Sequence, residues 1–176
     1  MTRARDLADL LTGGQTIETD DNTVQLTLKS TDADATSGPV LSLVRDSGSP
    51  ADSDVVGEIR LNADNDAGQE TEMANIFAQI GDASDGTEDA ALITRTMLGG
   101  SMRARVSHLV SETVFNEDSQ DLDFRVEGAT DANLFVVNAG NEKISIGTAT
   151  NDGFVHINKN FQSDIGMSMN DTSGSG

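Results

Sequence analysis

The spacing of hydrophobic residues changes after the opening segment of the chain. Leu7, Leu10 and Leu11 recur at helical spacing behind Thr2, a residue type favoured at helix N-caps. A pair of glycines follows, and glycine ends helices well. The pattern therefore predicts a short amphipathic helix over 2–11. A helix of about ten residues is marginal alone in water, so its leucine face requires a partner surface.

Beyond the glycine pair, apolar and polar residues alternate. In the first such run Val24, Leu26 and Leu28 share one face, which is the pattern of a half-buried strand. Clusters of Gly, Asp, Asn and Ser separate the runs and predict turns. The runs predict strands at 24–28, 40–45, 55–61, 73–80, 90–97, 102–110, 122–127, 134–137, 144–146 and 154–158.

This regular succession of strands and turns predicts a mainly β protein. We expect a short N-terminal helix followed by β-sandwich-like or intertwined β-strand domains. The expected organisation is an N-terminal helix within 1–14, a β-rich domain over 15–115, a short-stranded intertwined region over 116–160 and a C-terminal segment over 161–176. That last segment decays into Ser, Gly, Asp and Thr, so we expect the chain to be interrupted there.

Composition favours an assembly over a single globule. Hydrophobic residues make up 36% of the 176 residues and aromatic residues 3%, with no Trp or Tyr. Large aromatic side chains usually dominate core energetics, so one globule of this chain has little material for its core. Short aliphatic strands buried between chains suit the composition better.

Charge and cysteine content narrow the classes of function. The 30 acidic and 11 basic residues give a net charge of -19, which repels phosphate backbones and anionic lipids. We therefore expect neither nucleic-acid binding nor membrane insertion. The chain has no Cys, which excludes disulfides and thiolate sites, and no apolar run of membrane-spanning length or secretory signal is visible.

No catalytic pattern stands out. His108 and His156 both fall in strand-like runs and lack convergent partners in the sequence. The chain contains none of the serine-hydrolase, zinc-protease or phosphate-loop motifs. Carboxylate pairs arise by chance among 30 acidic residues. We expect no enzymatic activity and no cofactor.

One segment resembles the first half of a calcium loop. Asn62, Asp64 and Asp66 have the spacing of its ligands, but Ala67 stands where an EF-hand needs Gly, and the flanks are strand-like. The segment is therefore not an EF-hand. A weaker Ca²⁺ or Mg²⁺ site, formed where carboxylates converge on a threefold axis, remains an open alternative.

Several stretches resemble tail-fibre and virion fibre proteins of tailed bacteriophages that infect marine bacteria. These are the opening MTRARDLADLL, GDASDGTEDAAL at 81–92, ETVFNEDSQDLDFRVE at 112–127, and NLFVV through ISIGT at 133–148. The resemblance implies a homotrimeric fibre made in the host bacterial cytoplasm and built into the virion, in which 1–14 is the virion-anchoring helix and 116–160 is the fibre shaft. It also implies attachment to tail or adaptor proteins through the N-terminus, and contact with the host surface through a distal receptor-binding tip.

Two sets of residues are the candidate functional sites. The virion-anchoring set combines the leucine face of the helix with two basic residues: Arg3, Arg5, Leu7, Leu10 and Leu11. The trimer-core set takes the apolar positions of the short strands, which cannot form a core alone: Leu122, Phe124, Val126, Phe135, Val137, Ile144 and Ile146. In this register, Asp123, Arg125 and Glu127 face water.

Two alternatives to a tail fibre remain. A head fibre or decoration protein on the capsid fits the same sequence. A polysaccharide-binding module in the strand-rich region 24–110 is the other, although sugars generally stack on exposed aromatic rings and the chain has no Trp or Tyr.

Overall fold

The structure is a computed structural model that describes residue 14, residues 16–147 and the backbone of 155–157. The chain divides into two compact units, Met1–Leu43 and Val44–Gly176. The predicted helix over 2–11 lies outside the described residues. No helix occurs within them, and none of the described segments could cross a membrane as a helix.

The strands predicted at 24–28 and 40–45 are absent, and this part of the prediction is wrong. Val24, Leu26 and Leu28 are exposed and form no strand. Local side-chain contacts order the neighbouring turns instead, as where Asp21 Oδ1 accepts a hydrogen bond from the Thr23 amide at 2.9 Å. Alternation fixes which side chains share a face, but a strand also needs a hydrogen-bonded neighbour. No segment of the described chain supplies one here.

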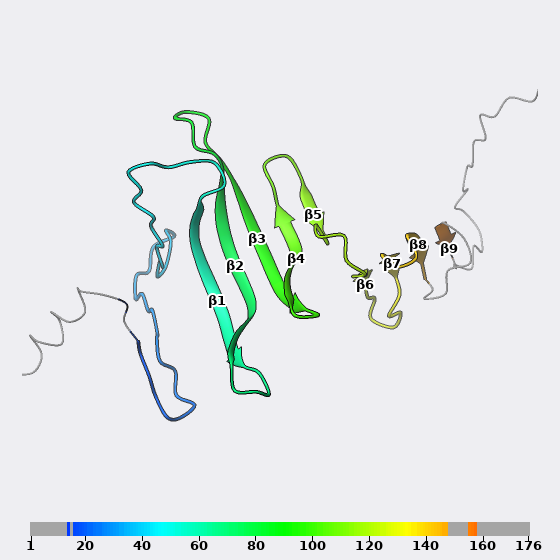
Figure 1. Cartoon of the computed structure of the whole chain (residues 1–176), viewed down its shortest axis with the longest axis horizontal. Helices are drawn as coiled ribbons and strands as arrows, with labels where there is room; N and C mark the ends of the chain where they lie inside the picture. Colours follow the sequence, from blue (N-terminus) through cyan, green and yellow to red (C-terminus); the bar gives the residue numbers. More distant parts are fainter. Residues whose placement is uncertain (1–13, 15, 148–154, 158–176) are drawn as a thin grey trace, which may run out of the picture. The chain divides into compact units, whose positions relative to one another are not determined.

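Five strands form an antiparallel meander, which we call sheet A, in the order β1-β2-β3-β4-β5 (Figure 1). Each strand pairs with the next in sequence, so the connections are hairpins. The strands are β1 (Val55–Asp64), β2 (Glu70–Asp82), β3 (Asp89–Leu98), β4 (Ser101–His108) and β5 (Thr113–Phe115).

Turn residues set the register of these hairpins. Gly99 and Gly100 link β3 to β4 with φ of 56° and 80°, and a tight two-residue hairpin requires such positive angles at both positions. Between β1 and β2, Asn65 Oδ1 accepts the amides of Ala67 and Gln69, both at 3.0 Å.

Four shorter strands form sheet B, in the order β6-β7-β8-β9. The pairs β6–β7 and β7–β8 are antiparallel, whereas β8–β9 is parallel. The strands are β6 (Phe124–Val126), β7 (Phe135–Asn138), β8 (Lys143–Ile146) and β9 (Val155–Ile157).

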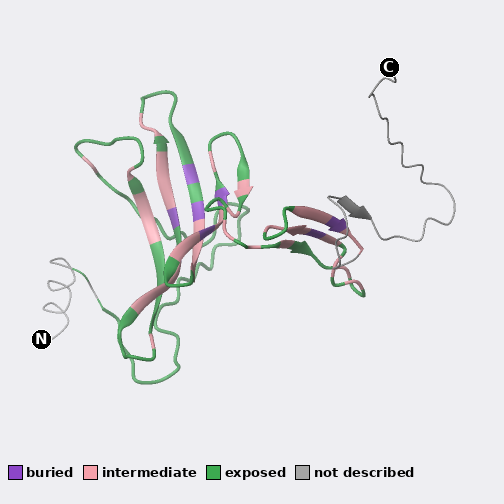
Figure 2. Cartoon of the chain, turned by 45° about the vertical axis from the view of Figure 1, so that its right-hand side comes forward, coloured by how far each residue is buried: buried purple, intermediate pink, exposed green. Residues whose placement is uncertain are grey.

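The buried core of the described chain lies on one face of sheet A, in the central strands (Figure 2). It consists of Phe77, Ala91, Ile93 and Ala104, with Leu109 packed against it. The guanidinium carbon of Arg95 stands 4.4 Å from the centre of the Phe77 ring, a cation–π contact that covers the largest core side chain.

The mainly β prediction is confirmed, and every strand predicted from residue 55 onward has a counterpart. The sequence analysis missed β5, because its three residues stand between polar segments with too few alternations to show a period.

Candidate functional site

The register of sheet B places six of the seven predicted trimer-core residues on one face. Phe124 lies opposite Val137, which in turn lies opposite Ile144, and Val126 lies opposite Phe135. Directly paired residues share a face, as do alternate residues along a strand. We call this set the apolar face of sheet B: Phe124, Val126, Phe135, Val137, Ile144 and Ile146.

A single chain covers this face incompletely. Phe124 is half-buried and Val126 is 40% exposed, while Leu122, which precedes β6, is half-buried. The opposite face of the sheet holds the most buried side chains, Val136 and Ser145. Neither was among the predicted core residues. Asp123, Arg125 and Glu127 are exposed, as the predicted register requires.

Three phenylalanines from successive strands meet at the start of sheet B. The ring centres of Phe115 and Phe124 are 4.8 Å apart, and those of Phe124 and Phe135 are 6.2 Å apart in an edge-to-face arrangement. Pairs of this geometry are worth about 0.5–1.5 kcal/mol beyond the area they bury. Phe115 belongs to β5 of sheet A, so the rings join apolar surface from both sheets.

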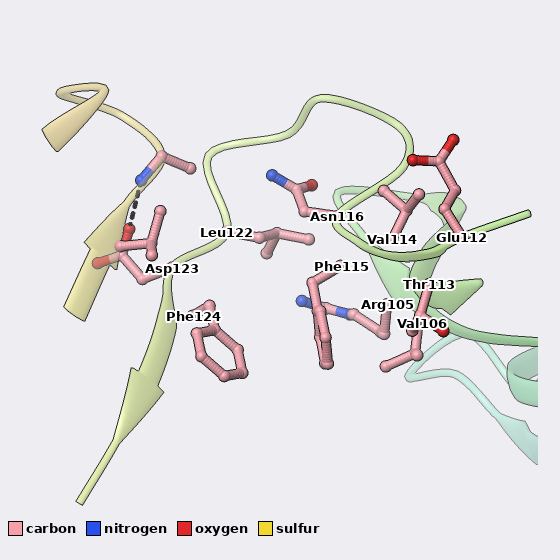
Figure 3. A pocket seen from close by; sticks show the side chains of 12 residues that line it. Arg105, Val106, Glu112, Thr113, Val114, Phe115, Asn116, Leu122, Asp123 and Phe124 are labelled. Atoms are coloured by element: carbon pink, nitrogen blue, oxygen red, sulfur yellow. Dashed lines mark hydrogen bonds between the residues drawn. The ribbon is translucent and has the colours of Figure 1, made fainter. Parts of the chain in front are cut away.

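A cavity of about 590 Å³ opens beside these rings (Figure 3). Leu122 and Phe124 line it from the segment that enters β6, and Val106 and Phe115 line it from β4 and β5. Its polar lining includes Arg105 and the carboxylates of Glu112 and Asp123. The lining is largely apolar, which suits an apolar side chain better than a charged ligand.

The connection between β5 and β6 is held by hydrogen bonds at both ends. Asp118 Oδ2 accepts the Ala104 amide at 2.7 Å, next to the irregularity in the β3–β4 pairing. Asp123 Oδ1 accepts the Ala139 amide at 2.9 Å, a bond drawn in Figure 3. The Asn116 side chain bonds Gln120 in both directions.

A scan against protein-family models, a search of curated proteins and a search of solved structures each gave no match.

Carboxylates of the described residues do not assemble a metal site. No group of three or more potential ligands converges among them. In the calcium-loop-like segment, Asn62 instead donates a hydrogen bond to Glu70 Oε1 at 2.6 Å. His108 Nδ1 contacts Thr113 Oγ1 at 3.2 Å across the β4–β5 pair. His156 lies on β9, where only the backbone is described.

A polar cluster lies beside the Phe77 core on the same face of sheet A, where Glu58 is the cross-strand partner of Phe77. Asn75 Nδ2 donates to Glu58 Oε1 at 2.6 Å and to Glu72 Oε1 at 2.7 Å, and Arg60 Nε donates to Glu58 Oε2 at 2.7 Å. The bonded Arg60 guanidinium lowers the pKa of Glu58, with help from Asn75 and Arg95, although burial acts in the opposite direction. Glu58 thus ties β1 to β2 as a carboxylate.

We predict that Glu58→Gln removes part of the acid sensitivity of sheet A. A carboxylate whose pKa is depressed by folding stabilises the fold above its unfolded pKa, and this contribution is lost as pH falls through the folded value. The wild-type protein should therefore be more stable than Glu58→Gln at pH 7. The difference should shrink below the ordinary glutamate value of 4.5. Urea unfolding of both proteins from pH 7 to pH 3 measures the difference in their free energies of unfolding. A difference that stays constant over this range would contradict the stabilising role of the Glu58 carboxylate.

The virion-anchoring residues Arg3, Arg5, Leu7, Leu10 and Leu11 lie outside the described residues. The structure adds Phe115 and Val106 to the candidate site, and the sequence analysis did not select either. Phe115 could have been selected because the chain has few aromatic residues. Its strand has only three residues between polar segments, so the alternation there was too short to predict a strand.

Proposed function

We propose that this protein is a non-enzymatic structural component of a bacteriophage virion, a homotrimeric tail fibre anchored by its N-terminus. In this role it links the tail to a distal tip that binds the host receptor. The observation that carries the proposal is the incompletely covered apolar face of sheet B, together with the resemblance of four stretches of the sequence to fibre proteins.

A threefold assembly would complete the burial that one chain leaves unfinished. The strands of sheet B have three or four residues, too few for an independent core. Three copies wound about one axis bring Phe124, Val137 and Ile144 of each chain against those of its neighbours. The residues that are half-buried in the single chain then form the interface between the chains of the trimer.

The acidic surface favours a fibre that associates through its trimer core and its N-terminus but not through its sides. At a net charge of -19 per chain, lateral contacts between fibres repel one another, which keeps a β-rich surface from aggregating. Arg3 and Arg5 give the N-terminus a local positive charge that favours an acidic socket on tail or adaptor proteins.

Imaging of labelled particles tests the place of the protein in the virion. A label on this protein should appear along the tail fibres in electron micrographs of purified virus. A label on the capsid would instead support the head-fibre alternative, and its absence from particles would refute the virion assignment.

We predict that the purified protein is a trimer. Light scattering should give three times the chain mass of 18.5 kDa, because burying the apolar face of sheet B favours association. The measurement should be made over a range of concentrations, with circular dichroism to show that the β structure is present. A folded, monodisperse monomer at every concentration would contradict the trimer.

A further inference from the structure

Sheet A also has an apolar face, on the side opposite the Phe77 core. Its central row crosses all five strands: Ile59 pairs with Ile76, and the row continues through Thr94, Val106 and Phe115. Five large hydrophobic side chains on this side are 45–59% exposed. We call these the apolar face of sheet A: Ile59, Leu61, Ile76, Leu92 and Phe115.

Carboxylates are segregated away from this face. By the register, every Asp and Glu within β1–β5 falls on the side of the Phe77 core: Glu58, Asp64, Glu70, Glu72, Asp82 and Asp89. The charged groups on the apolar side are basic. Arg103 pairs with Thr96, which lies on the apolar side next to the central row. Arg105 donates a hydrogen bond to Thr96 Oγ1 and so lies on the same side. In a chain with 30 acidic residues, a solvated face would be expected to carry some of them.

We infer that the apolar face of sheet A is a second self-association surface, covered by another copy of this chain. Two copies that each carry a charge of -19 repel one another wherever carboxylates face each other. The strands of sheet A carry no carboxylate on this side, which reduces that repulsion; the nearest carboxylates are those of Glu112 and Asp123, at the cavity beside Phe115. Exposed isoleucine, leucine and phenylalanine with arginine at the margin also form the composition typical of protein interfaces.

The apolar face of sheet A continues into that of sheet B. Phe115 ends the central row of sheet A, and its ring lies 4.8 Å from the ring of Phe124, the first residue of β6. Val106 and Phe115 line the same cavity as Leu122 and Phe124 (Figure 3). A copy that covers one face therefore reaches the other, and apolar side chains from that copy would enter the cavity. The inference deepens the proposed trimer, and it does not depend on attachment to a virion.

A thiol placed on the face tests whether it is covered. The chain has no Cys, so Ile76→Cys introduces a single reactive thiol in the 176-residue chain. Its alkylation by a maleimide should slow at least about tenfold when the protein is concentrated from the monomeric to the assembled range, since a buried thiol must wait for dissociation. Gln69→Cys, on the exposed β1–β2 turn, is the matched control and should react equally fast at both concentrations.

A second variant separates coverage from folding. Ile59→Thr with Ile76→Thr keeps β-branched residues while removing apolar surface, so circular dichroism should be unchanged. The association constant measured by sedimentation should fall at least about tenfold, which the loss of two isoleucine contacts readily accounts for. Gln69→Glu adds a charge outside the apolar face of sheet A, and it should leave the association constant unchanged.

The outcomes distinguish this inference from the proposed function. A fast-reacting Ile76→Cys thiol in an assembled trimer would overturn the inference and leave the sheet B core standing. Protection only after addition of a cell lysate to a monomeric chain would show a different occupant, and would also overturn it. Presence or absence of the protein on particles tests the virion role alone.

Discussion

Phe124→Asp should reduce trimer formation at least about a hundredfold, because a buried unpaired carboxylate costs upward of about 3 kcal/mol. Phe124 is central to the proposed assembly. Its ring contacts those of Phe115 and Phe135, it lines the cavity, and it belongs to the apolar face of sheet B. Three aspartates brought together at one level of the trimer would also repel one another.

Light scattering and sedimentation of the variant of the 176-residue chain measure this loss. Arg125→Gln is the matched control, since it makes the chain more negative by the same unit on the opposite face of the same strand. It should assemble like the wild-type protein. The milder Phe124→Ala should cost about 3–5 kcal/mol per site where the assembly buries the ring fully. Normal assembly of Phe124→Asp would show that the other face of sheet B is the one that packs between chains.

Deleting residues 1–14 should leave a folded trimer that is missing from purified virus particles. The predicted helix has Leu7, Leu10 and Leu11 on one side, and a helix this short cannot hide that side against itself. Its burial therefore depends on another protein. None of the described strands includes these residues, so the deletion should leave sheets A and B unchanged in circular dichroism.

A point variant makes the same test with less disturbance. Leu10→Asp should lower the copy number per particle at least about tenfold, since one buried leucine is worth more than the roughly 1.4 kcal/mol that a tenfold change requires. Thr12→Asp adds the same charge just beyond the predicted helix and outside its leucine face, and it should be incorporated normally. Normal incorporation of the deleted protein would move the anchor into the strands.

The sequence determined the class of fold and the faces of the strands. Alternation has a period of two, so it assigns side chains to faces without any knowledge of which strands pair. Phe124 and Val126 were placed on one side of β6 in this way, with Arg125 on the other, and the register of β6 with β7 agrees. Glycine-rich and aspartate-rich clusters separated the strands because few other residues tolerate those backbone angles.

The tertiary structure decided which runs became strands and which surfaces stayed open. Val24, Leu26 and Leu28 alternate as clearly as Ile59 and Leu61, yet only the latter pair lies in a strand, because β2 is there to bond it. Pairing depends on segments that are distant in sequence, and no local pattern encodes it. The segregation of carboxylates to one side of sheet A emerged for the same reason. Which residues share a face of a sheet is known only when the strands are placed in register. Ile59, Ile76 and Phe115 lie in one row through strand pairings that their sequence spacing does not show.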